Sequence, residues 1–232
     1  MTNSISIISK SDFLKKNKKP NQKQVWNAIA NAWEENRKNK ISIIEEFLKN
    51  KKGKIIDIGC GSGRNMIQNK NIEYYGIDFS SQQIAQTKEY AKKNKIKAKL
   101  FTATADKLPK TCKNNFFDAG LFIATLHCIE SVEKRKKTLQ ELYRVLKPNA
   151  ETLITVWNSE DKRFNQVNNH GPVYLSWKEN NIPYMRYYYL FKKQELISLI
   201  EKTGFTIIKF YPTKYQKDRF AKKNWIVRVK KI

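Results

Sequence analysis

Short apolar runs alternate with amphipathic stretches over the middle of the chain. Five runs have the length and the β-branched or aromatic content of buried strands, namely residues 54–59, 72–78, 98–103, 116–123 and 152–157. Between them apolar residues recur at helical spacing, most clearly over residues 132–146, where Leu139 and Leu142 share a face before Pro148. This alternation predicts a mostly parallel sheet with helices on both faces and a ligand crevice at the carboxyl ends of the strands.

Helical patterns also precede the first strand. Val25, Ile29 and Trp33 recur at four-residue spacing, and a second apolar stripe over residues 41–48 ends before Gly53. We therefore expect two helices ahead of the sheet.

The last part of the chain departs from the alternating pattern. After a loop from residue 158, the run 187–191 and a helix that ends at Gly204 lead to two late strands, 205–211 and 224–230. Their succession predicts a hairpin. The expected fold is α/β and Rossmann-like, with a mostly parallel seven-stranded sheet that ends in an antiparallel hairpin.

Positive charge dominates the chain. The 46 Lys and Arg residues against 21 Asp and Glu give a net charge of +25, which favours a polyanionic partner such as nucleic acid. A chain rich in Lys, Asn and Ile could also reflect genome composition alone. The first 23 residues hold six lysines against Asp12, so residues 1–23 are expected to form a flexible basic arm and residues 24–232 the folded domain.

The three cysteines are dispersed and show no C-x-x-C spacing, which argues against a disulfide framework and against a metal site. No apolar run approaches the ~18 residues that a membrane helix needs, and the first residues lack the pattern of a signal peptide. We expect a soluble, cytoplasmic protein without a bound metal.

A glycine-rich turn follows the first predicted strand. Gly59, Gly61 and Gly63 have the spacing G-x-G-x-G, whereas a nicotinamide cofactor prefers G-x-G-x-x-G. Asp57 precedes the turn, and Asp78 ends the second strand, where an acid suits a ribose diol. Together they predict an S-adenosylmethionine pocket, the alternative being a tight turn without a ligand.

The region 53–157 resembles the successive motifs of class I S-adenosylmethionine-dependent methyltransferases in its segments DIGCGSGRN, GIDFS, ATADKLP, FFDAGLFIATLHCI and LQELYRVLKPNAETLITVW. The resemblance implies that Asp57, Gly59 and Gly61 surround the methionine part of the cofactor and that Asp78 holds the ribose. Where many relatives have an acid near the adenine, this chain has Thr104 and Ala105. Either Thr104 substitutes with its hydroxyl, or Asp106 does so after a local shift.

The segment after the fourth strand, IATLHC, argues against two classes of methyl acceptor, exocyclic amines and pyrimidine C5 atoms. It lacks the N/D-P-P-Y/F pattern that gathers an exocyclic amine, and Cys128 follows His127 rather than the proline of pyrimidine C5 methylation.

A narrower resemblance is to the tRNA wobble-uridine carboxymethyl methyltransferase family. The pattern V-Y-x-x-I-A-x-x-F-x-x-T-R of that family's first helix is matched by Val25, Trp26, Ile29, Ala30, Trp33 and Arg37. Its H-H pair is matched by His127 alone, because Cys128 takes the second place. Its V-x-V-P-W loop is matched over residues 173–177 with Ser176 for proline, and its R-Y-Y-H-L-F over residues 186–191. The folded domain, residues 24–232, then resembles a methyltransferase domain with a substrate-side loop insertion at residues 158–186.

That family esterifies a carboxymethyl group already present on the wobble uridine, and the resemblance implies the same reaction here. A carboxylate with a pKa near ~4 is ionised at neutral pH and needs no strong base to attack a methyl group. Arg37 and Arg186 are candidates to hold the carboxylate, His127 to orient the uridine or carboxylate, and Trp26 to contact the cofactor. Each arginine could instead lie at the surface or contact phosphate, and His127 could be a core histidine.

The resemblance also implies two partners, the tRNA anticodon loop and a small zinc-binding activator protein. From residue 205 onward Asp218 is the only acid among nine Lys and Arg residues, and this stretch could grip phosphates. Two other functions remain open: a small-molecule methyltransferase, and a non-catalytic RNA-binding module with a degenerate pocket.

Overall fold

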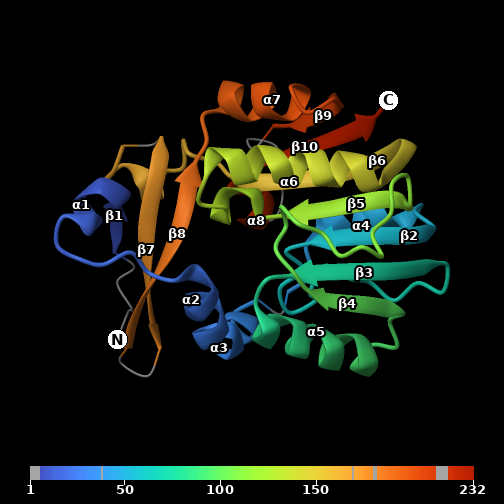
Figure 1. The fold of residues 1–232 in the computed structure, drawn as a ribbon, viewed down its shortest axis with the longest axis horizontal. Helices are drawn as coiled ribbons and strands as arrows, with labels where there is room; N and C mark the ends of the chain where they lie inside the picture. Colours follow the sequence, from blue (N-terminus) through green and yellow to red (C-terminus); the bar gives the residue numbers. More distant parts are fainter. Residues whose placement is uncertain (1–5, 38, 169, 180–181, 213–218) are drawn as a thin grey trace.

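Seven strands form the main sheet of the computed structural model, which describes residues 6–37, 39–168, 170–179, 182–212 and 219–232 (Figure 1). In sheet order they are β4 (Ala98–Thr102), β3 (Ile72–Asp78), β2 (Gly53–Ile58), β5 (Phe117–Ile123), β6 (Leu146–Trp157), β10 (Asn224–Lys231) and β9 (Phe205–Tyr211). The first five are parallel, and β10 is antiparallel to both of its neighbours. The predicted fold is confirmed, including the closing hairpin.

Helices cover both faces of this sheet. One core contains Leu139 and Leu142 of α6 (Val132–Val145) together with Leu196 and Ile200 of α7 (Lys193–Glu201). The core on the other face is built from α4 (Ser42–Lys49), with α5 (Ser81–Lys93) packed against it through partly buried side chains. Three shorter helical segments are α8 (Arg219–Lys222) and the 3₁₀ turns η1 (Leu126–Cys128) and η2 (Lys162–Phe164). The strand ends of β2, β3 and β5 remain open to a ligand.

The predicted first helix is broken in two. The backbone of Ile29 leaves the helical region (φ −91°, ψ 2°) between α2 (Gln22–Ala28) and α3 (Ala30–Glu35). In an unbroken helix, residues seven apart lie about 10 Å apart along the axis. The break lets the rings of Trp26 and Trp33 meet edge to face, with their centroids 4.9 Å apart.

A second, three-stranded sheet lies beside the main one (Figure 1). It consists of β1 (Ile7–Ser9), β7 (Gly171–Glu179) and β8 (Ile182–Leu190), all antiparallel, and α1 (Lys10–Leu14) follows β1. Its own small core joins Val173, Leu175, Tyr188 and Leu190 to Phe164. Burial of these side chains stabilises the second sheet.

This second sheet differs from two predictions. The expected loop insertion at residues 158–186 instead contains β7 and most of β8. The part of the expected flexible arm from residue 6 onward is folded, because β1 pairs with β7 and Phe13 packs on Tyr174 with ring centroids 4.8 Å apart. The folded part of the chain therefore begins before residue 24.

Residues 1–5 and residues 213–218 of the expected phosphate-binding stretch lie outside the described residues. Within the described part of the chain, no helix combines the length and apolar character needed to cross a bilayer. In the same part, no three His, Cys, Asp or Glu side chains gather as metal ligands would.

Candidate active site

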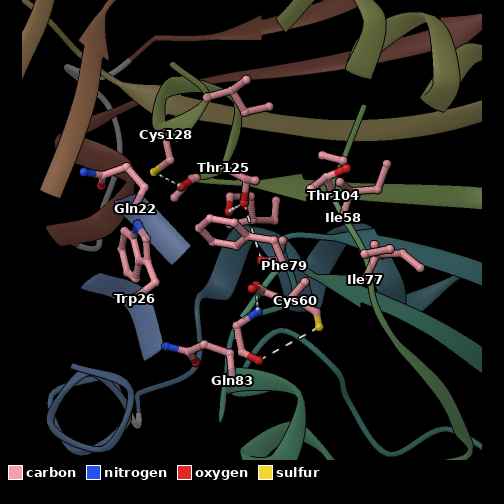
Figure 2. A pocket seen from close by; sticks show the side chains of 18 of the residues that line it. Gln22, Trp26, Ile58, Cys60, Ile77, Phe79, Gln83, Thr104, Thr125 and Cys128 are labelled. Carbon is pink, nitrogen blue, oxygen red and sulfur yellow. Dashed lines mark hydrogen bonds between the residues drawn. The ribbon is translucent and has the colours of Figure 1, made fainter. Parts of the chain in front are cut away.

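A pocket of about 260 Å³ lies at the carboxyl ends of the parallel strands. Its walls come from the turn after β2, the end of β3, the loop after β4, the segment after β5, and helices α2 and α3. Figure 2 shows Gln22 and Trp26 on one side of the pocket and Thr104 and Ile77 on the other. This is the crevice that a doubly wound sheet is expected to offer a ligand.

The glycine turn forms the floor of the pocket. Gly59 has φ +72°, and a Cβ added there would lie 2.1 Å from the Oγ1 atom of Thr125. Gly61 has φ +55°, but the nearest atom to an added Cβ is Oε1 of Gln83, 3.7 Å away. Gly59 is therefore required by a close approach of two segments, whereas Gly61 is required by backbone conformation.

Asp78 holds the turn in place at the end of β3. Its Oδ2 accepts a hydrogen bond from the Gly61 N–H (3.0 Å) and its Oδ1 accepts one from the Ser80 N–H (2.9 Å). Burial raises the pKa of this carboxyl to about 6, although the backbone N–H groups oppose that shift. Asp78 lines the pocket, where sequence reasoning predicted a ribose contact.

Asp57 lies outside the pocket lining and is fully buried. Neither of its carboxylate oxygens has a hydrogen-bond partner. Burial, and secondarily the charge of Asp78, raises its pKa to about 7, against the opposing effect of Arg64. An unpaired buried carboxylate beside a pocket is costly and suits a cationic ligand group.

This carboxyl predicts a pH dependence of stability. The folded chain keeps the Asp57 proton up to about pH 7, whereas the unfolded chain releases it near the ordinary value of 3.8. The free energy of unfolding of the ligand-free protein should therefore fall as pH rises from about 4 to about 7. Asp57→Asn should flatten that fall, as measured by urea denaturation at several pH values. Identical slopes in the two proteins would contradict this assignment.

The predicted contacts to the adenine end all reach the pocket. Thr104, Ala105 and Asp106 line it together, so the choice between Thr104 and Asp106 stays open. Trp26 lines the opposite wall from α2 (Figure 2).

The two predicted arginines are placed differently. Arg37 lines the pocket, with its Cζ 4.2 Å from the ring centroid of Trp33. Arg186 does not line it and is only 3% exposed. Its guanidinium donates to the Tyr188 hydroxyl (3.0 Å) and to the Ser176 carbonyl (3.2 Å). Arg37 can therefore meet a bound acceptor directly, whereas Arg186 lies behind the wall.

His127 is a core residue in this structure, outside the pocket lining. Its Nδ1 accepts a hydrogen bond from the Trp157 N–H (3.2 Å), and its ring stacks on Trp157 with centroids 5.0 Å apart. Burial lowers its pKa to about 3, so the imidazole is neutral at physiological pH. Because η1 turns successive side chains to different sides, Cys128 lines the pocket instead. The predicted substrate contact of His127 has no support in this geometry.

Sequence reasoning missed several lining residues. Arg64 and Asn65 follow the glycine motif directly, and that position was an available signal. Burial, and then the charge of Arg37, lowers the pKa of Arg64 to about 10. Gln22 had no signal, because it lies in the expected arm; its amide bridges the pocket to the second sheet through Met185 O (3.1 Å) and Tyr187 N (2.9 Å).

The sheet order, the glycine turn at the end of β2 and the acid at the end of β3 define a class I S-adenosylmethionine-dependent methyltransferase. The methyltransferase domain family matches residues 49–204. A solved S-adenosylmethionine-dependent methyltransferase from Methanosarcina mazei shares the fold, with a TM-score of 0.65 and 21% identity over 84% of this chain and 99% of that one.

More similar in sequence is the tRNA (carboxymethyluridine(34)-5-O)-methyltransferase of Schizosaccharomyces pombe. It is 30% identical over 211 residues, which cover 80% of this chain and 88% of that protein. The mouse tRNA (carboxymethyluridine(34)-5-O)-methyltransferase ALKBH8 is 34% identical over 62% of this chain, but the match spans only 21% of that longer protein. The chain belongs to the tRNA carboxymethyluridine(34) methyltransferase family.

The pocket fits S-adenosylmethionine. The Asp57 carboxyl, buried behind the lining without a hydrogen-bond partner, suits a cationic ligand end, and a Cβ added at Gly61 would meet only Gln83 Oε1, 3.7 Å away. Asp78 uses one hydrogen bond on each oxygen, so it retains lone pairs for a ribose diol.

Proposed function

We propose that this chain transfers a methyl group from S-adenosylmethionine to the carboxylate of 5-carboxymethyluridine at the wobble position of tRNA, giving the methyl ester. The observation that carries this proposal is the similarity to the fission yeast enzyme over 88% of its length. The net charge of +25 agrees with an RNA substrate and is not needed for a small-molecule acceptor.

The bound cofactor supplies an electrophilic methyl group on a positively charged sulfur. The acceptor carboxylate is already ionised, so no side chain has to remove a proton. The residues of the chain have to align the two reactants and exclude water. We assign the ribose to Asp78, the methionine end to the turn at Gly59 and Gly61, and the acceptor carboxylate to Arg37.

Arg37 suits this role because a guanidinium can hold one carboxylate oxygen with its N–H fork while the other oxygen attacks. The carboxylate loses its charge during the transfer. Too tight an ion pair would therefore slow the reaction. Because the Arg37 guanidinium also interacts with the face of Trp33, its ion pair with the carboxylate is of moderate strength.

The proposal is tested by incubating the chain with S-adenosylmethionine and tRNA that carries carboxymethyluridine. Mass spectrometry of the nucleosides should show the methyl ester. Equal methylation of unmodified uridine tRNA would contradict the substrate assignment. Calorimetry that detects no cofactor binding would favour a non-catalytic RNA-binding module.

We also propose a small zinc-binding activator protein as a partner, from the family resemblance alone, and a cytoplasmic location, from the three dispersed cysteines. Reconstitution with and without the activator protein tests the first. Turnover that is equally fast in both would remove the need for it.

The lysines between α1 and α2 and in the first turn of α2 predict a salt dependence of tRNA binding. Lys16, Lys18 and Lys23 are exposed, and the neighbouring Lys19 pairs with Glu130 of the pocket lining (2.6 Å). Replacing the three exposed lysines by glutamine should reduce the slope of log K against log salt by about 2, since each lost phosphate contact is worth about 0.7–0.9. Fluorescence titration at several salt concentrations measures this slope.

Point substitutions are preferable to deleting the first 23 residues, because the deletion would also remove β1 and Gln22. The matched control replaces Lys92, Lys93 and Lys95, which are exposed at the end of α5. It makes the same charge change and should alter the slope less. Equal changes in the two variants would show that binding responds only to net charge.

A further inference from the structure

Trp33 lies between two cations and two other indole rings. The Cζ atoms of Arg37 and Arg186 lie 4.2 Å and 5.3 Å from its ring centroid. Trp26 meets it edge to face at 4.9 Å, and Trp177 lies 5.7 Å away. The indole, which itself lines the pocket, is therefore the common neighbour of both guanidinium groups.

Within the part of the chain that the structure describes, Arg186 is a buried charge without a protein counterion. Among the described residues it forms no ion pair, and its Nε has no hydrogen-bond partner. The faces of Trp33, Trp177 and Tyr188 surround it, with centroids 5.3 Å, 5.0 Å and 5.5 Å from its Cζ. Ring quadrupoles stabilise such a cation but leave its positive charge uncancelled.

We propose that Trp33 is a positioning residue that sets the guanidinium of Arg37 and couples it to the field of Arg186, so that this end of the pocket selects an anionic acceptor. This inference rests on the proposed function. Arg37 supplies the contact, and Trp33 restricts where that contact can lie. Arg186 adds attraction for negative charge from behind the indole without touching the acceptor.

A long arginine side chain loses considerable conformational entropy when one rotamer is fixed. A guanidinium held over an aromatic face is ordered before the ligand arrives, and the stacking itself uses none of its N–H donors. Preorganisation of this kind raises affinity by reducing the cost of binding. Discrimination between an anion and its neutral analogue should therefore depend on Trp33.

The test compares two anticodon stem-loop RNAs, one with carboxymethyluridine and one with the neutral carbamoylmethyluridine at the wobble position. Binding is measured with S-adenosylhomocysteine present, so that no turnover occurs. The wild-type chain should prefer the carboxylate RNA, and Trp33→Leu should lose about tenfold in affinity for that RNA alone. Trp33→Phe should lie between them, because phenylalanine keeps a weaker aromatic face.

Three comparisons separate positioning from general damage. Trp225→Phe alters a buried core tryptophan on β10 and should leave the preference unchanged. In an Arg37→Ala background, Trp33→Leu should cost less than about twofold, because its effect acts through Arg37. Circular dichroism spectra of both Trp33 variants, recorded beside that of the wild-type chain, report whether they fold.

Each outcome decides between the hypotheses. A wild-type preference that persists in Trp33→Leu, or an equal loss for both RNAs, would overturn the role of Trp33 and leave the proposed function standing. A wild-type chain that binds both RNAs equally would overturn the carboxylate acceptor, and the role of Trp33 with it.

Discussion

Arg37→Ala is expected to lower turnover of carboxymethylated tRNA by about a hundredfold, while the affinity for S-adenosylmethionine stays near the wild-type value. The reason is that Arg37 lines the pocket and provides a planar fork for a carboxylate. Arg37→Lys keeps the charge but not the fork, so it should lose about tenfold. Single-turnover methyl transfer and calorimetry measure the two quantities.

Two controls accompany this measurement. The proposed zinc-binding partner is included, because an inactive lone subunit would say nothing about Arg37. Arg144→Lys changes an arginine of α6 that pairs with Glu141 (2.7 Å), outside the pocket lining, and should leave turnover unchanged. Wild-type turnover in Arg37→Ala would show that Arg37 does not hold the acceptor carboxylate. A parallel loss of cofactor affinity would reassign it to the cofactor.

Gly59→Ala should lower cofactor affinity by about a hundredfold and destabilise the fold by about 3 kcal/mol. The added Cβ would lie 2.1 Å from Thr125 Oγ1 and 2.4 Å from its Cγ2, at a backbone φ of +72°. The turn or the segment after β5 would have to move, and both line the pocket. Calorimetry of cofactor binding and chemical denaturation measure the two effects.

Gly171→Ala is the matched control for backbone strain. Gly171 has φ +94° on β7, but nothing lies within 4 Å of its added Cβ and it does not line the pocket. It should cost about 1–2 kcal/mol of stability and leave cofactor affinity unchanged. If Gly59→Ala behaved like this control, the close approach to Thr125 would not explain the requirement for glycine at position 59.

The main sheet could be predicted because its signals are local. β3 coincides with the predicted apolar run, and α6 occupies most of the predicted helix before Pro148. Buried parallel strands show continuous apolar runs, and helices show their period within a few turns. The glycine turn was visible for a similar reason, since its residues are consecutive in sequence.

The second sheet could not be predicted in the same way. β1 pairs with β7 across more than 160 residues, and its three residues carry little pattern of their own. A strand this short is stable only where a partner edge and a core already exist. The segment around it was expected to be flexible because it is rich in lysine, but all of its lysines except Lys10 are exposed while Gln22 is buried.

The amino-acid sequence by itself was enough to predict the parallel sheet, the glycine turn and the place of Arg37 in the site. Each of these predictions depends on residues close together in the chain or on one matched motif. Only the tertiary structure decided which predicted residues meet the ligand. Arg186 and His127 are buried outside the pocket lining, whereas Trp33 and Cys128 line the pocket. Whether a side chain is buried or lines the pocket depends on how distant segments pack. Two neighbours in sequence, such as His127 and Cys128, can therefore lie in different environments.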